Sequence, residues 1–442
     1  MTAAMRASPL PRTDWFGQPR GLTILFLTET WDTFSFYGMR ALLVLYMTKH
    51  LMFSQQSASW IYGCYAAMIY LTPVFGGIIA DRWLGRRKSV LLGGGIMAIG
   101  HFMMAFESML MPALATIAIG NGLFLPSLPS QIDSLYERDD PRRKSAYNVY
   151  YVGVNLGALA APLVIGTIGE LFGFHWGFAV AGVGMIVGLA TYVAGSRYLP
   201  PDSRAEVKSA NGLGGEGTVR VKAALDRAAI VRRYVLLLTI AAVVVIFRGA
   251  YEQLGNTVAL WADGSVDRSI GQSFRIPVTW FQSLNPLMVF VLTPLFVAWW
   301  TRQAKSGREP SSATKMTVGA ALVGLSYLLV SGISEIARQR GVSTSWPWLM
   351  LFIVVMTAGE LFILPIGLGL FGRLAPEGLS ATTIAVWFSA GVLGNLLAGW
   401  VGTLWTPLGP AAFFSLVGSV ALASAFGLAL LVPRVRRMER ET

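Results

Sequence analysis

The stretch Glu29 to Arg40, read E-T-W-D-T-F-S-F-Y-G-M-R, places ionisable side chains inside an apolar segment, residues 22–47. This segment is long enough for a membrane-spanning helix, which needs about 20 mostly apolar residues. At about 100° per residue, one face of that helix carries Glu29, Asp32, Thr33, Phe36, Tyr37 and Arg40. A charge near the bilayer centre costs at least ~2.5–3.5 kcal/mol. We interpret this face as the wall of a polar cavity that handles protons and a charged solute. The alternative is a set of packing charges paired with neighbouring helices.

The composition points to an integral membrane protein with many spans. The 442 residues are 54% hydrophobic and only 13% charged, and the mean hydropathy is +0.57, which excludes a soluble domain. Cys64 is the single cysteine, so neither a disulfide framework nor a cysteine-based metal site is available. The three histidines, His50, His101 and His175, are scattered along the chain. We therefore expect no metal site and no cofactor.

Twelve apolar segments can be laid out, six on each side of the polar stretch 198–233. That stretch is too short and too polar for two more spans, which would need about 40 apolar residues. The predicted units are residues 1–197, a cytoplasmic linker at 198–233, and residues 234–442. The end of the linker, V-R-V-K-A-A-L-D-R-A-A-I-V-R-R, is typical of a helix lying on the anionic inner leaflet.

The net charge of +12 could suggest a nucleic-acid partner, but the positions of the basic residues argue against one. With the N-terminus in the cytoplasm, most Lys and Arg residues fall on the cytoplasmic side, as the positive-inside rule requires. We expect a multi-pass protein of the cell (inner or plasma) membrane with both termini in the cytoplasm. Its partners would be the lipid bilayer, protons and a small solute.

The second half of the chain also carries ionisable residues in apolar segments. Arg248 and Glu252 are four residues apart and so lie one helical turn from each other. Glu360 stands in the run G-E-L-F-I-L-P-I-G-L-G, beside residues that break helices. Charges inside the membrane in both halves favour a central site between two repeats.

Two sets of motifs resemble a known family. The loop G-G-I-I-A-D-R-W-L-G-R-R-K, residues 76–88, resembles the loop signature of the major facilitator superfamily, which latches two helices in one conformational state. The first-helix motif resembles the pattern E-x-x-E-R-F-x-Y-Y-G of proton-dependent oligopeptide transporters. The likeness continues in Y-Y-V-G-V-N-L-G (150–157), I-P-V-T-W-F-Q-S-L-N-P (276–286) and G-E-L-F-I-L-P-I-G-L (359–368). It implies a major facilitator fold, with twelve transmembrane helices in two six-helix bundles related by pseudo-two-fold symmetry, and a monomer.

The resemblance also implies roles for individual residues. Arg40 would bind the carboxylate of a di- or tripeptide, or of a peptide-like solute that carries an amino group. The other substrate-binding residues would be Tyr37, Tyr70, Asn155, Arg248, Asn285, Glu360 and Trp387. Proton coupling would involve Glu29, Asp32 and Glu252. The gate would use Asp81, Arg82 and Arg86 of the loop signature.

The chain departs from the family pattern at two positions. The second acid and the following Arg of the first-helix motif are Asp32 and Thr33 here, and the Lys of the fourth helix is Leu125. Two cations near the carboxylate end of the site are therefore missing. Arg248, one turn from Glu252, is a candidate replacement, and a modified, peptide-like substrate becomes plausible.

The function expected from these patterns is proton symport by alternating access. Two alternatives stay open: a proton-driven exporter of a peptide-like or drug-like compound, and a membrane receptor that binds a solute without moving it. The sequence offers no nucleophile–base constellation and no metal-ligand spacing, and its glycine motifs lack the strand context of a nucleotide site. We therefore predict that the protein is not an enzyme.

Overall fold

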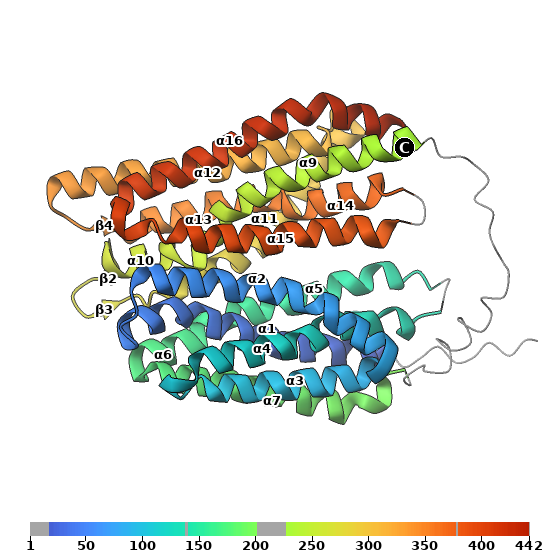
Figure 1. Cartoon of the computed structure of the whole chain (residues 1–442), viewed down its shortest axis with the longest axis horizontal. Coiled ribbons are helices and arrows are strands. Elements are labelled where there is room, and N and C mark those ends of the chain that lie inside the picture. Colours follow the sequence, from blue (N-terminus) through green and yellow to red (C-terminus); the bar gives the residue numbers. More distant parts are fainter. Residues whose placement is uncertain (1–16, 138–139, 201–226, 377–378, 442) are drawn as a thin grey trace, which may run out of the picture.

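The computed structural model describes residues 17–137, 140–200, 227–376 and 379–441, and its long helices run along the longest axis of the molecule (Figure 1). Figure 1 shows two groups of helices. The lower group, α1 to α7, comes from residues 17–200, which we call the first half. The upper group, α9 to α16, comes from residues 227–441, the second half. Within the described residues the predicted fold class is confirmed: an all-α membrane protein of twelve spanning helices in two bundles of six.

The first half contains α1 (Arg20–Leu45) with η2 (Tyr46–His50), α2 (Gln55–Ile79) with η3 (Ala80–Leu84), α3 (Arg86–Met103), η4 (Glu107–Met109), α4 (Leu110–Ser127), η5 (Pro129–Gln131), η6 (Asp133–Leu135), α5 (Arg143–Ala161) with η7 (Pro162–Gly166) and α6 (Thr167–Phe172), and α7 (Phe174–Gly195) with η8 (Ser196–Tyr198). Here α5, η7 and α6 form one crossing of the membrane. Ten spans in the described residues are long and apolar enough to cross a membrane. The charge-bearing helices α1 and α3 complete the twelve.

The second half contains α9 (Arg227–Tyr251) with η9 (Glu252–Gly255) and α10 (Thr257–Gly264), α11 (Trp280–Lys305), α12 (Ser312–Arg340), α13 (Trp346–Leu361) with α14 (Leu364–Leu374), α15 (Ser380–Gly402) and α16 (Trp405–Glu441). Four two-residue strands lie in the connections: β1 (Val266–Asp267) pairs in parallel with β4 (Thr344–Ser345), and β2 (Ser269–Ile270) pairs antiparallel with β3 (Phe274–Arg275). Most of the predicted linker, with the first part of its surface helix, lies outside the described residues. The described part from Arg227 onward belongs to α9.

Two spanning helices of the second half are interrupted beside acidic residues. The seventh span, predicted as one continuous segment, is interrupted by a 3-10 turn, η9, from Glu252 to Gly255. The tenth is divided between α13 and α14, just after Glu360. An interrupted helix leaves backbone groups unpaired inside the membrane, which is tolerated only where protein or water satisfies them. Both breaks, and the acids beside them, are therefore expected to face the protein interior and not the lipid.

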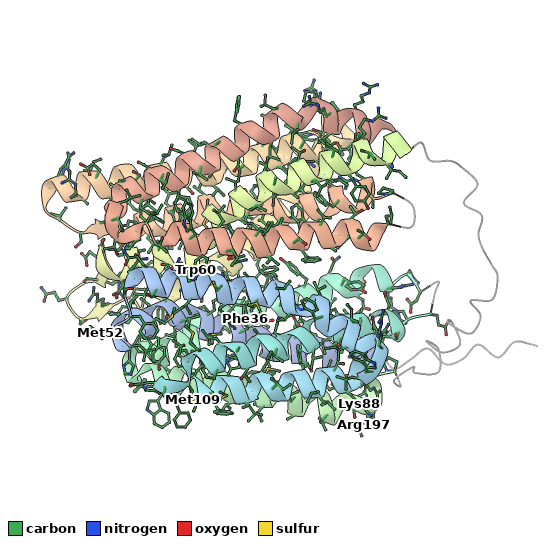
Figure 2. All side chains as sticks on the ribbon, in the orientation of Figure 1. Phe36, Met52, Trp60, Lys88, Met109 and Arg197 are labelled. Carbon is green, nitrogen blue, oxygen red and sulfur yellow. The ribbon has the colours of Figure 1, made fainter. Side chains whose placement is uncertain are left out.

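The two ends of the molecule differ in how the halves meet. We call the end with β1 to β4 the strand end (left in Figure 1) and the end with residues 434–439 of α16 the tail end (right). In Figure 2, Lys88 and Arg197 lie at the tail end and Met52 at the strand end. The hydrogen bonds that join described residues of the two halves lie in the middle or toward the strand end. They include Ser59 Oγ to Asn256 Oδ1, 2.9 Å, and Lys49 Nζ to Asp263 Oδ1, 2.9 Å. The structure is thus closed at the strand end.

Close backbone packing contributes to this closure. Gly63 of α2 faces Gly399 of α15, and a Cβ on Gly63 would lie 2.4 Å from the Cα of Gly399 and 2.8 Å from the backbone oxygen of Asn395. Small residues let helices approach closely in membranes, where packing drives association. The two glycines therefore let the halves meet at the strand end.

Replacing Gly63 by valine is expected to open the strand end, because the new side chain has no room while the halves are closed. Spin labels at Gln56 and Leu408, in a Cys64→Ser background, should move apart by on the order of 5 Å in a rigid-body shift. Gly95→Val is the matched control, since nothing lies within 4 Å of a Cβ at Gly95. An unchanged label distance in Gly63→Val would contradict this role.

Candidate functional site

The ionisable residues of α1 are buried in the protein, as the pattern of the first helix predicts. Glu29 is 5% exposed and Asp32 is 7% exposed, and the side chain of Arg40 is 18% exposed. Tyr37, on the same face of α1, is 38% exposed although it stands in the middle of a spanning helix. The structure distributes these residues over separate clusters of polar contacts.

The first cluster joins the two halves through Glu252. One carboxylate oxygen, Oε2, accepts a hydrogen bond from Arg40 Nη2 of the first half at 2.6 Å. The other oxygen, Oε1, lies 3.2 Å from Arg248 Nη1 of the second half. Glu252 is 4% exposed, so a single buried carboxylate is shared by two arginines. Buried charges of this kind require such partners, because removing one of them leaves an uncompensated charge.

Two tyrosines of α2 support the arginines of this cluster. Arg40 Nε donates to the hydroxyl of Tyr62 at 2.7 Å, and Arg248 Nη1 donates to the hydroxyl of Tyr70 at 3.4 Å. Each guanidinium carbon also lies 5.3 Å from the ring centre of its tyrosine, a cation–π arrangement. The Tyr62 hydroxyl fits against Gly255, where a Cβ would lie 2.0 Å from it. Glycine at the helix break therefore makes room for the tyrosine.

The second cluster lies wholly in the second half. Asn285 Nδ2 of α11 donates to Glu360 Oε2 at 2.7 Å and also approaches Thr357 Oγ1 at 2.9 Å. Tyr251 lies close enough to both Glu360 and Glu252 to interact with them. Tyr251 thus connects the first and second clusters.

The third cluster surrounds Glu29 in the first half. The hydroxyl of Tyr150 on α5 donates to Glu29 Oε2 at 2.5 Å, and Thr33, one turn further along α1, lies close to the same carboxyl. Asp32 lies near enough to interact with Glu29. Two acids belong to this cluster, and no cation is hydrogen-bonded to either among the described residues. Such an arrangement can hold a proton.

Some predicted site residues are placed apart from these clusters. The side-chain amide of Asn155 donates to Tyr151 O of its own helix at 3.0 Å. Trp387 packs against Phe371, with ring centres 5.1 Å apart, and covers Gly367. Among the residues that the structure describes, neither side chain forms a hydrogen bond or ion pair with Arg40 or Glu360. Their predicted roles in substrate binding remain predictions.

Three tyrosines that contact the clusters were missed by the sequence analysis. Tyr62 and Tyr150 each hydrogen-bond to an ionisable member, and Tyr251 lies close enough to Glu360 and Glu252 to interact with both. The available signals were spacing and adjacency: Tyr62 and Tyr70 recur on one side of α2, and Tyr251 directly precedes Glu252. Tyrosine is common near membrane surfaces, so its presence alone did not single out these positions.

The predicted gate residues lie at the tail end of the first half. Arg86 Nη1 donates to Ser130 O at 3.0 Å and approaches Ser134 Oγ at 3.3 Å, which ties the start of α3 to the short helices η5 and η6 that follow α4. Asp81 and Arg82 belong to η3 and are exposed, and neither forms an ion pair among the residues that the structure describes. Their role as a latch stays a prediction.

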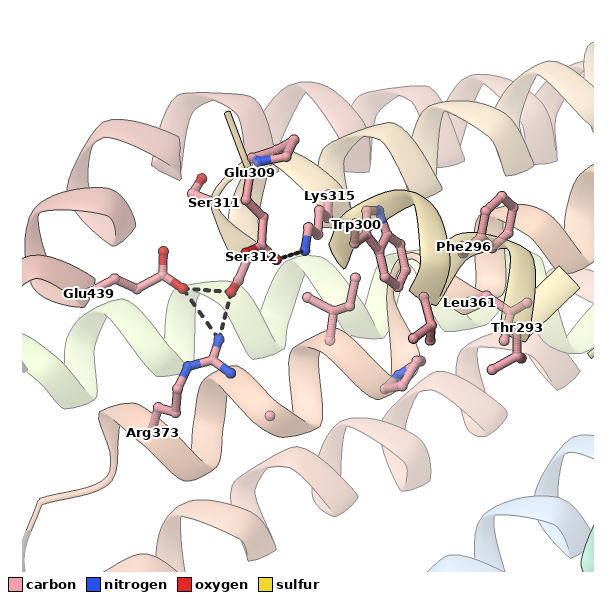
Figure 3. A pocket seen from close by; sticks show the side chains of 15 residues that line it. Thr293, Phe296, Trp300, Glu309, Ser311, Ser312, Lys315, Leu361, Arg373 and Glu439 are labelled. Atoms are coloured by element: carbon pink, nitrogen blue, oxygen red, sulfur yellow. Dashed lines mark hydrogen bonds and ion pairs between the residues drawn. The ribbon is translucent and has the colours of Figure 1, made fainter. Parts of the chain in front are cut away.

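A separate pocket of about 580 Å³ opens at the tail end of the second half, between α11, α12, α14 and α16 (Figure 3). Arg373 Nη2 donates to Ser312 Oγ at 2.7 Å, and Ser312 Oγ donates to Glu439 at 2.5 Å. Lys315 Nζ pairs with Glu309 at 2.6 Å. None of the predicted site residues lines this pocket. Its polar contacts tie the tail ends of these helices together.

The expectation that the histidines are scattered is wrong for two of them. The Nε2 atoms of His50 and His175 lie 3.1 Å apart, and His50 Nε2 also lies 2.8 Å from Glu107 Oε1. His101 is buried elsewhere, in α3. The sequence could not reveal this group, because its members come from three separate connections at the strand end of the first half.

Comparisons with known proteins agree on one family. A sequence profile of the POT family matches residues 87–211 and 209–409. The chain is 32% identical to an uncharacterised transporter, YclF, of Bacillus subtilis (strain 168), over 97% of this chain and 96% of that protein. It is 30% identical to a di-/tripeptide transporter of Lactococcus lactis subsp. cremoris, over 95% of each. A crystal structure of a mutant of peptide transporter POT in complex with alafosfalin aligns with a TM-score of 0.84 and 28% identity, over 97% of both chains.

Proposed function

The chain belongs to the POT family of major facilitator transporters, and from this premise we propose that it imports di- or tripeptides, or peptide-like solutes with an amino group, together with protons. The single observation that carries the proposal is the carboxylate of Glu252, held between Arg40 of the first half and Arg248 of the second. This contact joins the two bundles. It involves Arg40, which is expected to bind the substrate, and Glu252, which is expected to take part in proton coupling.

The geometry supports an exchange of partners at Arg40. While Glu252 is ionised, it occupies the guanidinium of Arg40 at 2.6 Å. A proton on Glu252 removes that charge and makes the guanidinium available to the carboxylate of a solute. Arginine suits this task because its planar fork can bind a carboxylate through two hydrogen bonds. Binding a proton therefore favours binding of the solute, which is the coupling that symport requires.

The second cluster supplies the opposite pole of the site. Glu360 is buried and accepts a hydrogen bond from Asn285, so a solute ammonium can find a carboxylate and an amide oxygen there. Tyr251 links Glu360 with Glu252. A zwitterion with its carboxylate at Arg40 and its amino group at Glu360 would satisfy both poles. The names of the matched relatives, a di-/tripeptide transporter and a peptide transporter bound to alafosfalin, support peptide-like substrates.

The replaced motif positions are consistent with this arrangement. Thr33 stands where the family pattern has Arg, and it lies close to the Glu29 carboxyl. Arg248 is the second cation beside Glu252. We assign Arg248 the role of compensating for the missing cations, so that the carboxylate end of the site keeps two positive groups.

The orientation in the membrane follows from the basic residues. Lys88 and Arg197 lie at the tail end (Figure 2), as do the basic residues that end α11 and α16. By the positive-inside rule the tail end faces the cytoplasm. The structure, closed at the strand end, then corresponds to a conformation that faces inward. The membrane potential would assist import of positive charge by ~2.3 kcal/mol per charge per 100 mV.

The substrate class is tested by a thermal-shift screen of di- and tripeptides and peptide-like compounds on the purified full chain, at two pH values. A ligand that binds only the folded protein stabilises it, by about 2.7 kcal/mol when the free ligand concentration is 100 times Kd. The melting temperature therefore rises. Stabilisation by zwitterionic peptides, greater at the lower pH, is expected. Stabilisation by none of the peptide-like compounds would contradict the proposed substrate class.

Two alternatives are separated by transport assays with the best ligand from this screen. A receptor would bind the ligand but show no counterflow in proteoliposomes. A proton-driven exporter would load everted vesicles when their interior is acidified. The proposal predicts counterflow. It also predicts that the solute accumulates when protons move inward down their gradient.

Replacing Glu29 by glutamine is expected to reduce uptake driven by a pH gradient by at least about tenfold, a loss typical of removing a positioned proton-transfer group. The amide keeps a hydrogen-bond acceptor for Tyr150 but cannot carry the proton. Counterflow should persist, because it needs no net proton movement. Glu137→Gln, at an exposed position, is the control. Unchanged gradient-driven uptake in Glu29→Gln would remove this residue from the coupling route.

A further inference from the structure

A group of side chains at the strand end of the first half is not explained by transport of a peptide. His50 is the last residue of η2, Glu107 opens η4, and His175 lies in the first turn of α7. One potential ligand atom from each lies within 4.8 Å of the other two. We propose that these three side chains bind a divalent transition-metal ion, with Zn²⁺ as its representative.

The distances between the ligand atoms fit such an ion. His50 Nε2 lies 2.8 Å from Glu107 Oε1 and 3.1 Å from His175 Nε2, and His175 Nε2 lies 3.9 Å from Glu107 Oε1. Ligands at 2.0–2.1 Å from a tetrahedral Zn²⁺ are about 3.3 Å apart. The three separations lie on both sides of that value, so side-chain movements of a few tenths of an ångström would place all three atoms around one ion.

Protons alone satisfy this arrangement poorly. A ring nitrogen of histidine has one position in the plane of the ring, which holds either a hydrogen or a lone pair. His50 Nε2 must carry a hydrogen to bond the Glu107 carboxylate, and that single hydrogen must then also serve the lone pair of His175 Nε2. If both rings were protonated there, two N–H groups would point at each other. A cation between the three atoms accepts every lone pair at once.

The surroundings hold both rings in position and leave the ion a route from water. Tyr46 stacks on the His50 ring, with centres 5.4 Å apart and planes at 18°, and meets the His175 ring edge-on at 5.8 Å. His175 Nδ1 is buried and has no hydrogen-bond partner in the part of the chain that the structure describes, so Nε2 is the nitrogen that can reach a ligand. The Glu107 side chain is 61% exposed and both histidines are 35% exposed. A water molecule can therefore complete the coordination.

Imidazole with one carboxylate favours Zn²⁺, and Ni²⁺ or Cu²⁺ at similar sites, over Mg²⁺ or Ca²⁺, which prefer oxygen ligands. All three ligands belong to the first half, so the ion would tie η2, η4 and α7 together without linking the two bundles. The expected effect is a more stable first half. Lys49, the residue before His50, forms the ion pair with Asp263 that helps to close the strand end.

The test uses the full chain, purified in detergent without a polyhistidine tag, and Zn²⁺ alone as the probe. Isothermal titration should show one Zn²⁺ bound per chain, with affinity lowered at least about tenfold in His50→Ala and in His175→Ala. Glu107→Gln should weaken binding as well, whereas Glu137→Gln should match the wild type. Zn²⁺ should also raise the melting temperature of the wild type and of Glu137→Gln, but not that of His50→Ala.

A spectroscopic measurement keeps the test decisive if a variant folds poorly. X-ray absorption of the zinc-loaded wild type should show two imidazole ligands with oxygen ligands beside them. A coordination shell of oxygen alone, or equal Zn²⁺ affinity in all the folded variants, would overturn the proposal. So would the absence of Zn²⁺ binding to the wild type at micromolar concentrations.

Discussion

Replacing Arg40 by alanine is expected to lower the affinity for a peptide substrate by about 30-fold or more. Truncating one member of a buried charged pair costs 2–5 kcal/mol, and each 1.4 kcal/mol is a factor of ten. The variant loses the group proposed to bind the carboxylate and leaves Glu252 with Arg248 alone. Affinity is measured by isothermal titration with a dipeptide from the thermal-shift screen.

A peptide whose C-terminus is amidated separates recognition from general damage to the site. The wild type should bind the amide much more weakly than the acid, whereas Arg40→Ala should bind the two about equally. Arg40→Lys keeps the charge but loses the planar fork, and an intermediate affinity is expected. Arg338→Ala is the control, because Arg338 is 71% exposed and pairs locally with Glu335. If Arg40→Ala still distinguished acid from amide as the wild type does, Arg40 would not be the carboxylate site.

Replacing Glu252 by glutamine is expected to abolish accumulation driven by a proton gradient, by at least about 100-fold, while counterflow continues. Glutamine resembles the protonated acid, so neither Arg40 nor Arg248 retains its ion pair. Substrate affinity in the wild type should rise as the pH falls, because a proton on Glu252 makes Arg40 available. In the variant this part of the pH dependence should disappear, leaving the high-affinity form at every pH.

The control for this variant is Glu335→Gln, which removes a carboxylate at the surface of the strand end. Counterflow and gradient-driven uptake are measured in the same proteoliposomes. Loss of both activities together would indicate structural damage rather than uncoupling. Full gradient-driven accumulation in Glu252→Gln would contradict the proposed partner exchange.

Local features of the site were predictable from the sequence because they depend on short-range spacing. Charges in the first apolar segment identified its polar face, and the i,i+4 spacing of Arg248 and Glu252 predicted that they would meet. The structure places them 3.2 Å apart. Hydropathy and the distribution of basic residues were sufficient for the twelve spanning helices, since each helix must satisfy its own backbone in lipid.

Contacts between distant segments were not predictable in the same way. Arg40 and Glu252 are 212 positions apart, and no local pattern indicates which of several acids the arginine meets. The break of the seventh span at η9 was missed because the polar run E-Q-L-G lies inside a segment, residues 234–259, that is apolar as a whole. His50 and His175 are 125 positions apart, and they meet only because η2 ends and α7 begins on the same side of one bundle.

The most direct test is uptake of the best-stabilising solute into proteoliposomes that contain the wild-type chain, with and without an inward proton gradient. If the Glu252 carboxylate between Arg40 and Arg248 couples protons to the solute, the solute should accumulate above its external concentration with the gradient, and a protonophore should reduce it to equilibration. Equal uptake with and without the gradient would contradict coupling through this site.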